Sequence, residues 1–167
     1  AEAYGDRAQA YKAQGKEALA LQDLNQALKY DPGQAESFYQ RGISHQRLDQ
    51  HREAIADFFQ TLRLNPKHAK AANSRGLSYQ TIKNIPQAIA DYTAAIKIDP
   101  NFAEPYCNRG ALYLGQGRMI EAKNDFDRCG KLDPGMKTWT QTKLKQVAEK
   151  ETKGLFNKLK KKFKKIF

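Results

Sequence analysis

The chain has 167 residues, of which 40% are hydrophobic, and a formal net charge of +11. A chain of this length and apolar content can bury the core of one folded domain. Residues 1–136 carry 18 Lys and Arg against 16 Asp and Glu, whereas the 11 lysines from Lys137 onward face only Glu149 and Glu151. The basic character therefore belongs to the C-terminal segment, and the nearly neutral remainder disfavours nucleic acid as a partner.

Neither a membrane-spanning helix nor a disulfide-rich fold is expected. No apolar run approaches the roughly 18–20 residues that a transmembrane helix needs, and no signal-like stretch opens the chain. The first residue is Ala1, which leaves a processed leader or upstream residues open. Cys107 and Cys129 form no CxxC pair and are too few for a disulfide framework. Cysteine usage therefore favours a reducing, cytoplasmic compartment, with a single bridge left open.

A period of 34 residues organises the chain before Lys137. Pro32, Pro66, Pro100 and Pro134 fall at this spacing, in YDPG, LNPK, IDPN and LDPG. The predicted organisation is four units followed by a capping helix and a tail, with these bounds: 1–34, 35–68, 69–102, 103–136, 137–153 and 154–167. Repeats of this length are typical of arrays in which each unit buries its apolar face against the next.

Each unit is predicted to hold two amphipathic helices, because small and large residues recur at steps of three or four. The recurring sets are Tyr4, Phe38, Ala72, Tyr106; Ala8, Gly42, Gly76, Gly110; Tyr11, His45, Tyr79, Tyr113; Ala20, Ala54, Ala88, Ala122; Leu24, Phe58, Tyr92, Phe126; and Ala27, Thr61, Ala95, Cys129. Gly15, Gly117 and the Asn84-Ile85-Pro86 segment mark turns between the two helices. The proline near the end of each unit stops the second helix. Small residues beside large ones predict helices that approach closely.

This pattern resembles the tetratricopeptide repeat family in its spacing, its small residues and its terminal proline. The resemblance covers residues 1–136, although the Trp or Leu that is common early in the family's first helix is replaced here by other residues. It implies an all-α fold, a right-handed superhelical solenoid of helix-turn-helix repeats. In the family, the first helices form a concave wall that binds extended peptides or partner helices.

An arginine and an aspartate recur in every unit with a constant offset of sixteen residues. The expected partners are Arg7 and Asp23, Arg41 and Asp57, Arg75 and Asp91, and Arg109 and Asp125. We expect each pair to link the two helices of its unit as a structural ion pair. A ladder of arginines for anionic ligands is the less favoured alternative, because the acids would neutralise it.

The resemblance also implies which residues line the groove: Tyr39, Gln40, Ile43, Lys70, Asn73, Ser74, Leu77, Gln80, Cys107 and Asn108. Some family members carry an asparagine ladder for a peptide backbone, and only Asn108 matches it here. Others clamp the terminal carboxylate of heat-shock chaperones, and only Lys70 fits that clamp, so we expect none. Glu2, Glu36 and Glu104 either give one edge an acidic character or simply suit the helix dipole, and we favour the second interpretation.

The last two segments are predicted to cap the array and then to form a basic amphipathic helix. Trp139, Leu144, Val147 and Ala148 are candidate cap contacts, and Gly154 is expected to break or bend the helix. Beyond it, apolar residues step by three or four between lysines, and the predicted tail contacts are Leu155, Phe156, Leu159, Lys160, Lys161, Phe163, Lys164, Ile166 and Phe167. Such a helix suits an anionic membrane surface or an acidic partner groove. Packing of its apolar residues on the array or on a second copy is as strongly favoured as membrane binding.

Enzyme signatures are missing from the sequence, which has no GxxxxGK loop, no HExxH motif and no His/Cys cluster with metal-ligand spacing. His45 takes a packing place, and His51 and His68 lie near turns. We predict a non-enzymatic adaptor or scaffold, without cofactor or metal, that binds a peptide or partner protein in its groove and is localised by its tail. The alternatives are a self-assembling structural protein, whose tail or convex face forms oligomers, and peripheral membrane association through the tail.

Overall fold

A computed structural model describes the backbone of residues 1–163 and the side chains of residues 1–160. Within these residues the fold is all-α, as the sequence predicted, with α-helices, connecting turns and one short 3-10 helix. The contacts divide the chain into two compact units, unit 1 (Ala1–Pro100) and unit 2 (Asn101–Phe167).

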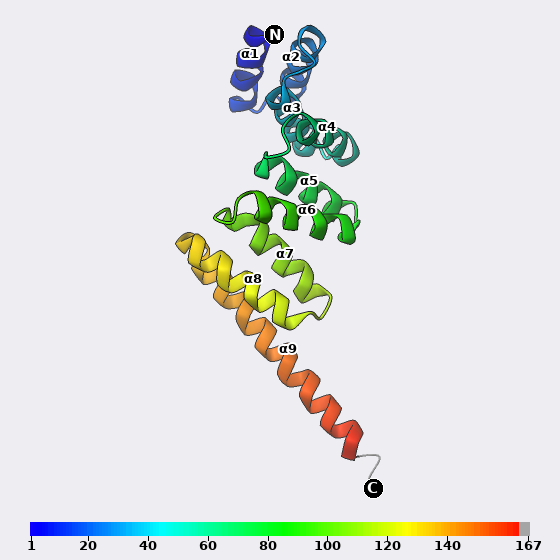
Figure 1. Ribbon diagram of the computed structural model, residues 1–167, viewed down its shortest axis with the longest axis vertical. Coiled ribbons are helices and arrows are strands. Elements are labelled where there is room, and N and C mark those ends of the chain that lie inside the picture. The colour runs from blue at the N-terminus through cyan, green and yellow to red at the C-terminus, as the bar shows by residue number, and fades with distance from the viewer. Residues whose placement is uncertain (164–167) are drawn as a thin grey trace. The chain divides into compact units, whose positions relative to one another are not determined.

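Unit 1 is a stack of three helix pairs. Each helix packs on the next one along the chain, and α3 also contacts α5. Figure 1 shows the pairs following one another from the N-terminus. The helices are α1 (Glu2–Ala13), α2 (Glu17–Tyr30), α3 (Ala35–Arg47), α4 (His51–Leu64), α5 (Ala69–Thr81) and α6 (Ile85–Ile98).

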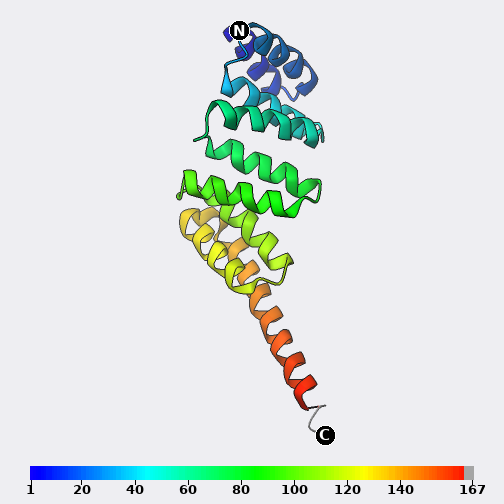
Figure 2. The same ribbon diagram turned by 45° about the vertical axis from the view of Figure 1, so that its right-hand side comes forward.

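Unit 2 contains one further pair and a long last helix. Its elements are α7 (Ala103–Gly115), α8 (Met119–Leu132), the 3-10 helix η1 (Pro134–Met136) and α9 (Lys137–Phe163). The first part of α9 packs on α8 and touches α7, whereas its C-terminal half runs past both helices (Figures 1 and 2). The helix continues through Gly154, so the break expected at that residue is not found.

The recurring proline ends each second helix together with the residue before it. Because a residue that precedes proline avoids the helical region, Asp31, Asn65, Asp99 and Asp133 take φ values from −143° to −126°. Asp31, Asn65 and Asp133 then accept a hydrogen bond on Oδ1 from the backbone N–H two residues on, at 3.0, 3.1 and 2.8 Å. The Asx turn built in this way connects each of these pairs to the next helix.

The turn inside each pair uses a left-handed residue at one recurring position. Gly15 and Gly117 have φ values of 71° and 76°, and the equivalent residues Asp49 and Lys83 have values of 58° and 64°. Glycine takes this conformation without steric cost, whereas a residue with a Cβ does not. The second and third pairs therefore carry local strain that the first and fourth avoid.

Each of the four arginines holds its aspartate through two parallel hydrogen bonds. Arg Nε and Nη2 donate to the two carboxylate oxygens over 2.6–2.8 Å. The aspartate side chains are only 5–7% exposed, whereas the arginine side chains range from 57% for Arg7 to 15% for Arg109. The hydrogen bonds and charge of Arg7 lower the pKa of Asp23, and burial only partly opposes them. Each pair thus joins the two helices of its repeat at a buried aspartate, while the arginine of the first pair remains largely in water.

A disulfide links the two helices of the fourth pair. Cys107 of α7 and Cys129 of α8 are bonded, with their Cα atoms 5.5 Å apart. Both residues are buried. The single bridge that the sequence left open is thus formed, and Cys107 is not the free groove thiol that its predicted place implied.

Candidate binding surfaces

A hollow of about 350 Å³ lies between α1 and the start of α3 in unit 1. We call it the α1–α3 hollow, and its lining is Glu2, Gly5, Asp6, Gln9, Leu24, Gln34, Glu36, Ser37 and Gln40. Glu2, Asp6 and Glu36 are exposed. A side chain at Gly5 would meet nothing within 4 Å, which shows how open this part of the wall is. The lining includes three acids and no basic residue.

The acids reach the α1–α3 hollow because they lie near the starts of their helices on one face. Glu2, Gly5, Asp6 and Gln9 step by three or four residues along α1 and share that face. Across the hollow, Lys12 Nζ donates to Gln40 Oε1, and the Gln40 amide in turn donates to Glu36. Burial, followed by the nearby charge of Arg47, lowers the pKa of Lys12. This chain of contacts connects α1 to α3 beside the hollow and holds the carboxylate of Glu36.

A second contact with the same offset of 28 residues joins α3 to α5. Gln46 Nε2 donates to the backbone oxygen of Ser74 and to Ser78 Oγ, both at 2.8 Å. It repeats the contact between Lys12 and Gln40 one unit further along. Gln40 and Ser74, which were predicted to meet a peptide, therefore also hold neighbouring first helices together.

Glu17 and Arg47 form a further link between the first two pairs. Arg47 Nη1 donates to Glu17 Oε1 at 2.5 Å, and the Glu17 side chain is only 10% exposed. Burial alone would raise the pKa of Glu17, but the hydrogen bond from Arg47 and the charges of Arg47 and Lys12 lower it overall. The contact stabilises the packing beside the α1–α3 hollow and leaves the hollow itself unobstructed.

A basic hollow of about 750 Å³ lies elsewhere on unit 1, around the start of α5 and the end of α6. Its lining is Asn65, Lys67, His68, Ala69, Lys70, Lys97, Ile98 and Asp99. His68 caps α5 by accepting a hydrogen bond on Nδ1 from the Ala71 backbone N–H at 3.1 Å. Its ring lies against the Tyr39 ring at a tilt of 40°, with the ring centroids 4.6 Å apart. Lys70, predicted in the groove, lines this basic hollow, which adjoins the α1–α3 hollow where His68 Nε2 lies 3.6 Å from Glu36 Oε2.

In unit 2, the first part of α9 completes the core of the α7–α8 pair. Val147 is 2% exposed and packs with Leu114, Ala122 and Phe126. Leu144 joins this cluster, and the Trp139 ring meets the Phe126 ring edge-on at 5.6 Å. These three side chains are the predicted cap contacts; Ala148, the fourth, is exposed.

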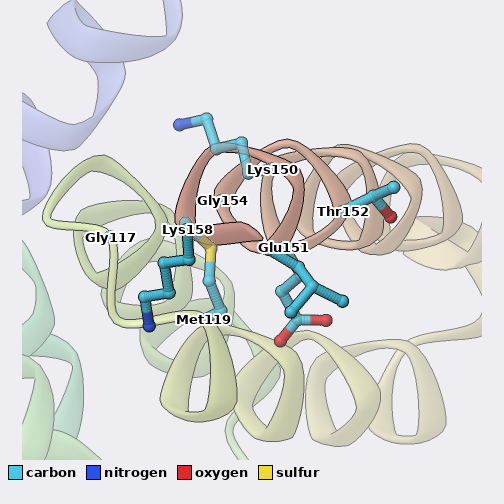
Figure 3. Close-up of a pocket in the computed structure, with 8 residues that line it drawn as sticks. Gly117, Met119, Lys150, Glu151, Thr152, Gly154 and Lys158 are labelled. Carbon is cyan, nitrogen blue, oxygen red and sulfur yellow. The ribbon is translucent and has the colours of Figure 1, made fainter. Parts of the chain in front are cut away.

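A third hollow, of about 610 Å³, lies where α9 leaves this core. Met119, at the start of α8, lies below α9, and Lys158 extends from α9 beside the turn that carries Gly117 (Figure 3). Lys150 Nζ donates to the Leu114 backbone oxygen at 3.4 Å. Past this point every described side chain of α9, from Glu151 to Lys160, is exposed.

Family models decide what kind of array this is. A tetratricopeptide repeat model matches residues 1–34 and 103–135, and a second TPR model matches residues 82–117. Together these ranges take in just over half of the chain. The chain belongs to the tetratricopeptide repeat family. Helix-pair arrays of this family serve as protein-interaction scaffolds.

Solved structures of TPR proteins share the fold. A crystal structure of MamA aligns with a TM-score of 0.69 and 25% identity over 92% of this chain and 80% of that one. MamA from Desulfovibrio magneticus RS-1 gives a TM-score of 0.74 at 24% identity over 91% of both chains. The first TPR of Spaghetti (RPAP3), bound to the HSP90 peptide SRMEEVD, gives 0.66 at 21% identity over 69% of this chain and 90% of that one. No curated protein sequence matches this chain.

Two residues of the groove predicted from the TPR resemblance are not on an open wall. Asn73 is 6% exposed and Cys107 is 3% exposed. Each lies three residues before a small packing glycine, Gly76 or Gly110, and so shares the face that turns toward the second helix. The predicted groove set is corrected at these two places.

The other predicted groove residues have differing exposure. Leu77 is 42% exposed, and Lys70 is exposed as well. Tyr39 and Ile43 are half-buried against Ala54, Phe58 and Ala71. Gln80 and Asn108 are also half-buried, and Gln80 accepts a hydrogen bond from the Tyr92 hydroxyl at 2.8 Å. Asn108 belongs to unit 2.

The tail residues fall into two groups. Leu155, Phe156, Leu159 and Lys160 are exposed. The side chains of Lys161, Phe163, Lys164, Ile166 and Phe167 lie outside the described residues. Within the part of the chain that the structure describes, no three His, Cys, Asp or Glu side chains gather as metal ligands. In that same part, no helix combines the length and the hydropathy required to cross a membrane.

Proposed function

We propose that this TPR protein is a scaffold that holds a basic segment of a partner protein in the α1–α3 hollow. The observation that carries the proposal is the grouping of Glu2, Asp6 and Glu36 around an open hollow with no basic side chain in its lining. The first helices of TPR arrays are the family's binding elements, and this hollow lies between two of them.

Charge complementarity selects the class of ligand. An exposed ion pair contributes only about 0.2–1 kcal/mol, so one acid would discriminate little, whereas three acids around one hollow add their effects. Lysine or arginine side chains of an extended segment can pair with Glu2 and Glu36, which come from two different helices. The exposed Gln9 side chain can hydrogen-bond the backbone of the same segment.

The same charges argue against a chaperone tail as the ligand. The peptide in the RPAP3 structure, SRMEEVD, carries two glutamates and a terminal aspartate. Three acids around the α1–α3 hollow would repel such a peptide. This supports the expectation, drawn from the sequence, that the chain lacks a carboxylate clamp.

The proposal is tested by fluorescence anisotropy with two labelled peptides of equal length, one alternating lysine with alanine and the other alternating glutamate with alanine. We expect the lysine peptide to bind the wild-type chain and the glutamate peptide not to bind. Glu2→Gln/Glu36→Gln should weaken binding of the lysine peptide about fivefold at low salt. Glu53→Gln/Glu149→Gln changes the net charge equally at exposed acids outside the hollow and should leave the affinity nearly unchanged. Equal weakening in both variants, or no preference for lysine, would refute the proposal.

A further inference from the structure

The helix α9 carries two successive sets of apolar residues, of which the first is packed and the second is exposed. The first face contains Leu144 and Val147 and packs in the core of unit 2. At 3.6 residues per turn, Leu155, Leu159 and Phe156 lie about 80°, 120° and 180° around the helix from Val147. Leu144 lies at about 60°, so Leu155 continues the edge of the first face beyond the core, whereas Leu159 and Phe156 turn away from Val147. We call Leu155, Phe156 and Leu159 the second apolar face, and these side chains are 61%, 64% and 47% exposed.

The second apolar face has no role in completing the TPR fold. Val147 already closes the apolar cluster formed by Leu114, Ala122 and Phe126. A polar helix would serve equally well beyond that point, yet three large apolar residues lie within five positions of one another and are open to solvent. Exposed apolar residues grouped in this way mark an interaction surface.

Lysines border the second apolar face on both sides. Lys153 and Lys160 lie about 240° and 220° around the helix from Val147, next to Phe156, and Lys158 lies at about 20°, on the side of Leu155. After Glu151 the sequence contains no acid, and the last seven residues add four lysines to Phe163, Ile166 and Phe167. A lysine-flanked apolar arc without acids is typical of a helix that lies in a membrane interface.

We propose that the C-terminal half of α9 binds the surface of an anionic lipid bilayer. Leu155, Phe156 and Leu159 enter the interface, and the flanking lysines meet the head groups. Each lysine near such a surface contributes attraction that salt weakens. The proposed membrane contact uses residues of unit 2, whereas the α1–α3 hollow uses residues of unit 1, so the two contacts share no residue.

A second copy of the chain is a poorer occupant of this face. Pairing two such helices would bury the apolar arcs but would also bring two rows of lysines together, and like charges in contact are destabilising. The α1–α3 hollow of another copy offers acids, but the only large apolar side chain in its lining is Leu24, which is 2% exposed. A bilayer supplies both the apolar and the anionic partner over the whole length of the face.

The test is flotation of the full chain with vesicles of phosphatidylserine and phosphatidylcholine, compared with phosphatidylcholine alone. We expect binding to the anionic vesicles only, reduced by added salt. Phe156→Ser/Leu159→Ser should lower the bound fraction at least tenfold. The matched control is Phe59→Ser, because Phe59 on α4 is 54% exposed and lies far from α9 in sequence; it should bind like the wild type.

A second pair of variants separates local from overall charge. Lys153→Gln/Lys160→Gln should weaken binding roughly 10- to 30-fold, whereas Lys29→Gln/Lys131→Gln, at exposed sites on α2 and α8, should have a much smaller effect. Circular dichroism verifies that every variant stays folded. Equal binding to both vesicle types, or none, overturns the proposal. Absence of binding, together with a mass that rises with concentration and falls in Phe156→Ser/Leu159→Ser, would assign the face to a second copy instead.

Discussion

The ring of Tyr92 in α6 fills the space that a side chain on Gly76 in α5 would need. A Cβ built on Gly76 falls 2.9 Å from two carbons of that ring. The equivalent distances are 2.7 Å from Gly42 to Phe58 and 2.9 Å from Gly110 to Phe126. In the first pair, the smaller Leu24 packs in one cluster with Ala8. Where the second helix carries an aromatic ring, the facing position of the first helix is glycine. Where the second helix carries the smaller leucine, the facing position is alanine.

Gly76→Ala should destabilise unit 1 by about 1–3 kcal/mol, because the added methyl group has to displace a fully buried ring. Gly5→Ala is the matched control, since it is also a glycine in a first helix but has no atom near its Cβ. Its higher helix propensity should stabilise the protein by up to about 1 kcal/mol. Urea unfolding followed by circular dichroism measures both changes. A loss of stability in Gly5→Ala equal to that in Gly76→Ala would contradict the packing argument.

Removing the arginine of an Arg–Asp pair should lower the free energy of unfolding more where that arginine is more buried. Arg75→Ala leaves Asp91 buried without its partner, which should lower the free energy of unfolding by about 3 kcal/mol. Arg7→Ala should cost clearly less, because Arg7 is 57% exposed and water can replace it, whereas Arg75 is 20% exposed. Urea unfolding of the two variants at neutral pH makes the comparison. Equal losses would show that exposure of the arginine does not set the strength of the pair.

The stability of unit 1 should fall in acid through Asp23 and Glu17. Both carboxyl groups have a folded pKa below the ordinary value. Their contribution is therefore fully present above the unfolded values of about 3.9 and 4.3, and it is lost as the pH falls through the folded values, where the unfolded state binds more protons. Asp23→Asn and Glu17→Gln should each lower stability at pH 7 and flatten the decline below about pH 4. Parallel pH profiles for the variants and the wild type would refute this assignment.

The features that the sequence predicted well are those that repeat at a constant offset. Arg75 and Asp91 lie sixteen residues apart, as do Gly76 and Tyr92, and in each case the same relationship occurs in the other pairs. Four copies of one pattern reveal which positions face each other within a pair. The helices and the members of the ion pairs follow from that periodicity, which also carries the resemblance to the family.

Contacts between successive pairs were harder to predict, because they depend on how far each first helix is rotated. The link between Gln46 and Ser74 has an offset of 28 residues, repeated by Lys12 and Gln40, but the amino acids differ, so only the geometry reveals it. The burial of Asn73 is different, because its place three residues before Gly76 already indicates the face toward the second helix, and the groove implied by the TPR resemblance did not take that spacing into account. For α9, the directions of its apolar residues can be counted from the sequence, but only the contact of Val147 with α8 shows which of them pack.

The strained turn positions offer a test that concerns the backbone only. Lys83 has a φ of 64° where the first and fourth pairs have glycine. Lys83→Gly should therefore stabilise unit 1 by about 1 kcal/mol. Asp49→Gly should stabilise unit 1 by a smaller amount, because aspartate tolerates this conformation better than lysine does. Gly15→Ala, the reverse change in α1–α2, should cost about 1 kcal/mol. Thermal unfolding ranks the stabilities of the three variants. A more stable Gly15→Ala variant would contradict the assignment of strain to this turn position.

The disulfide between Cys107 and Cys129 should stabilise unit 2 and leave unit 1 unaffected. It joins residues 22 apart in the sequence, and closing a loop of that size removes chain entropy from the unfolded state worth about 3 kcal/mol. A reductant should therefore lower the unfolding temperature of the wild-type chain. In hydrogen-exchange measurements, only amides in α7 and α8 should lose protection.

The variant Cys107→Ala/Cys129→Ala separates the bond from the packing of the two sulfur atoms. It should start from a lower unfolding temperature than the oxidised wild type and show no response to reductant, because no bond remains to be cut. Alkylation followed by mass spectrometry verifies the thiol state of each sample. A wild-type chain whose unfolding temperature is the same with and without reductant, despite complete alkylation in the reduced sample, would show that the bridge does not contribute to the stability of unit 2.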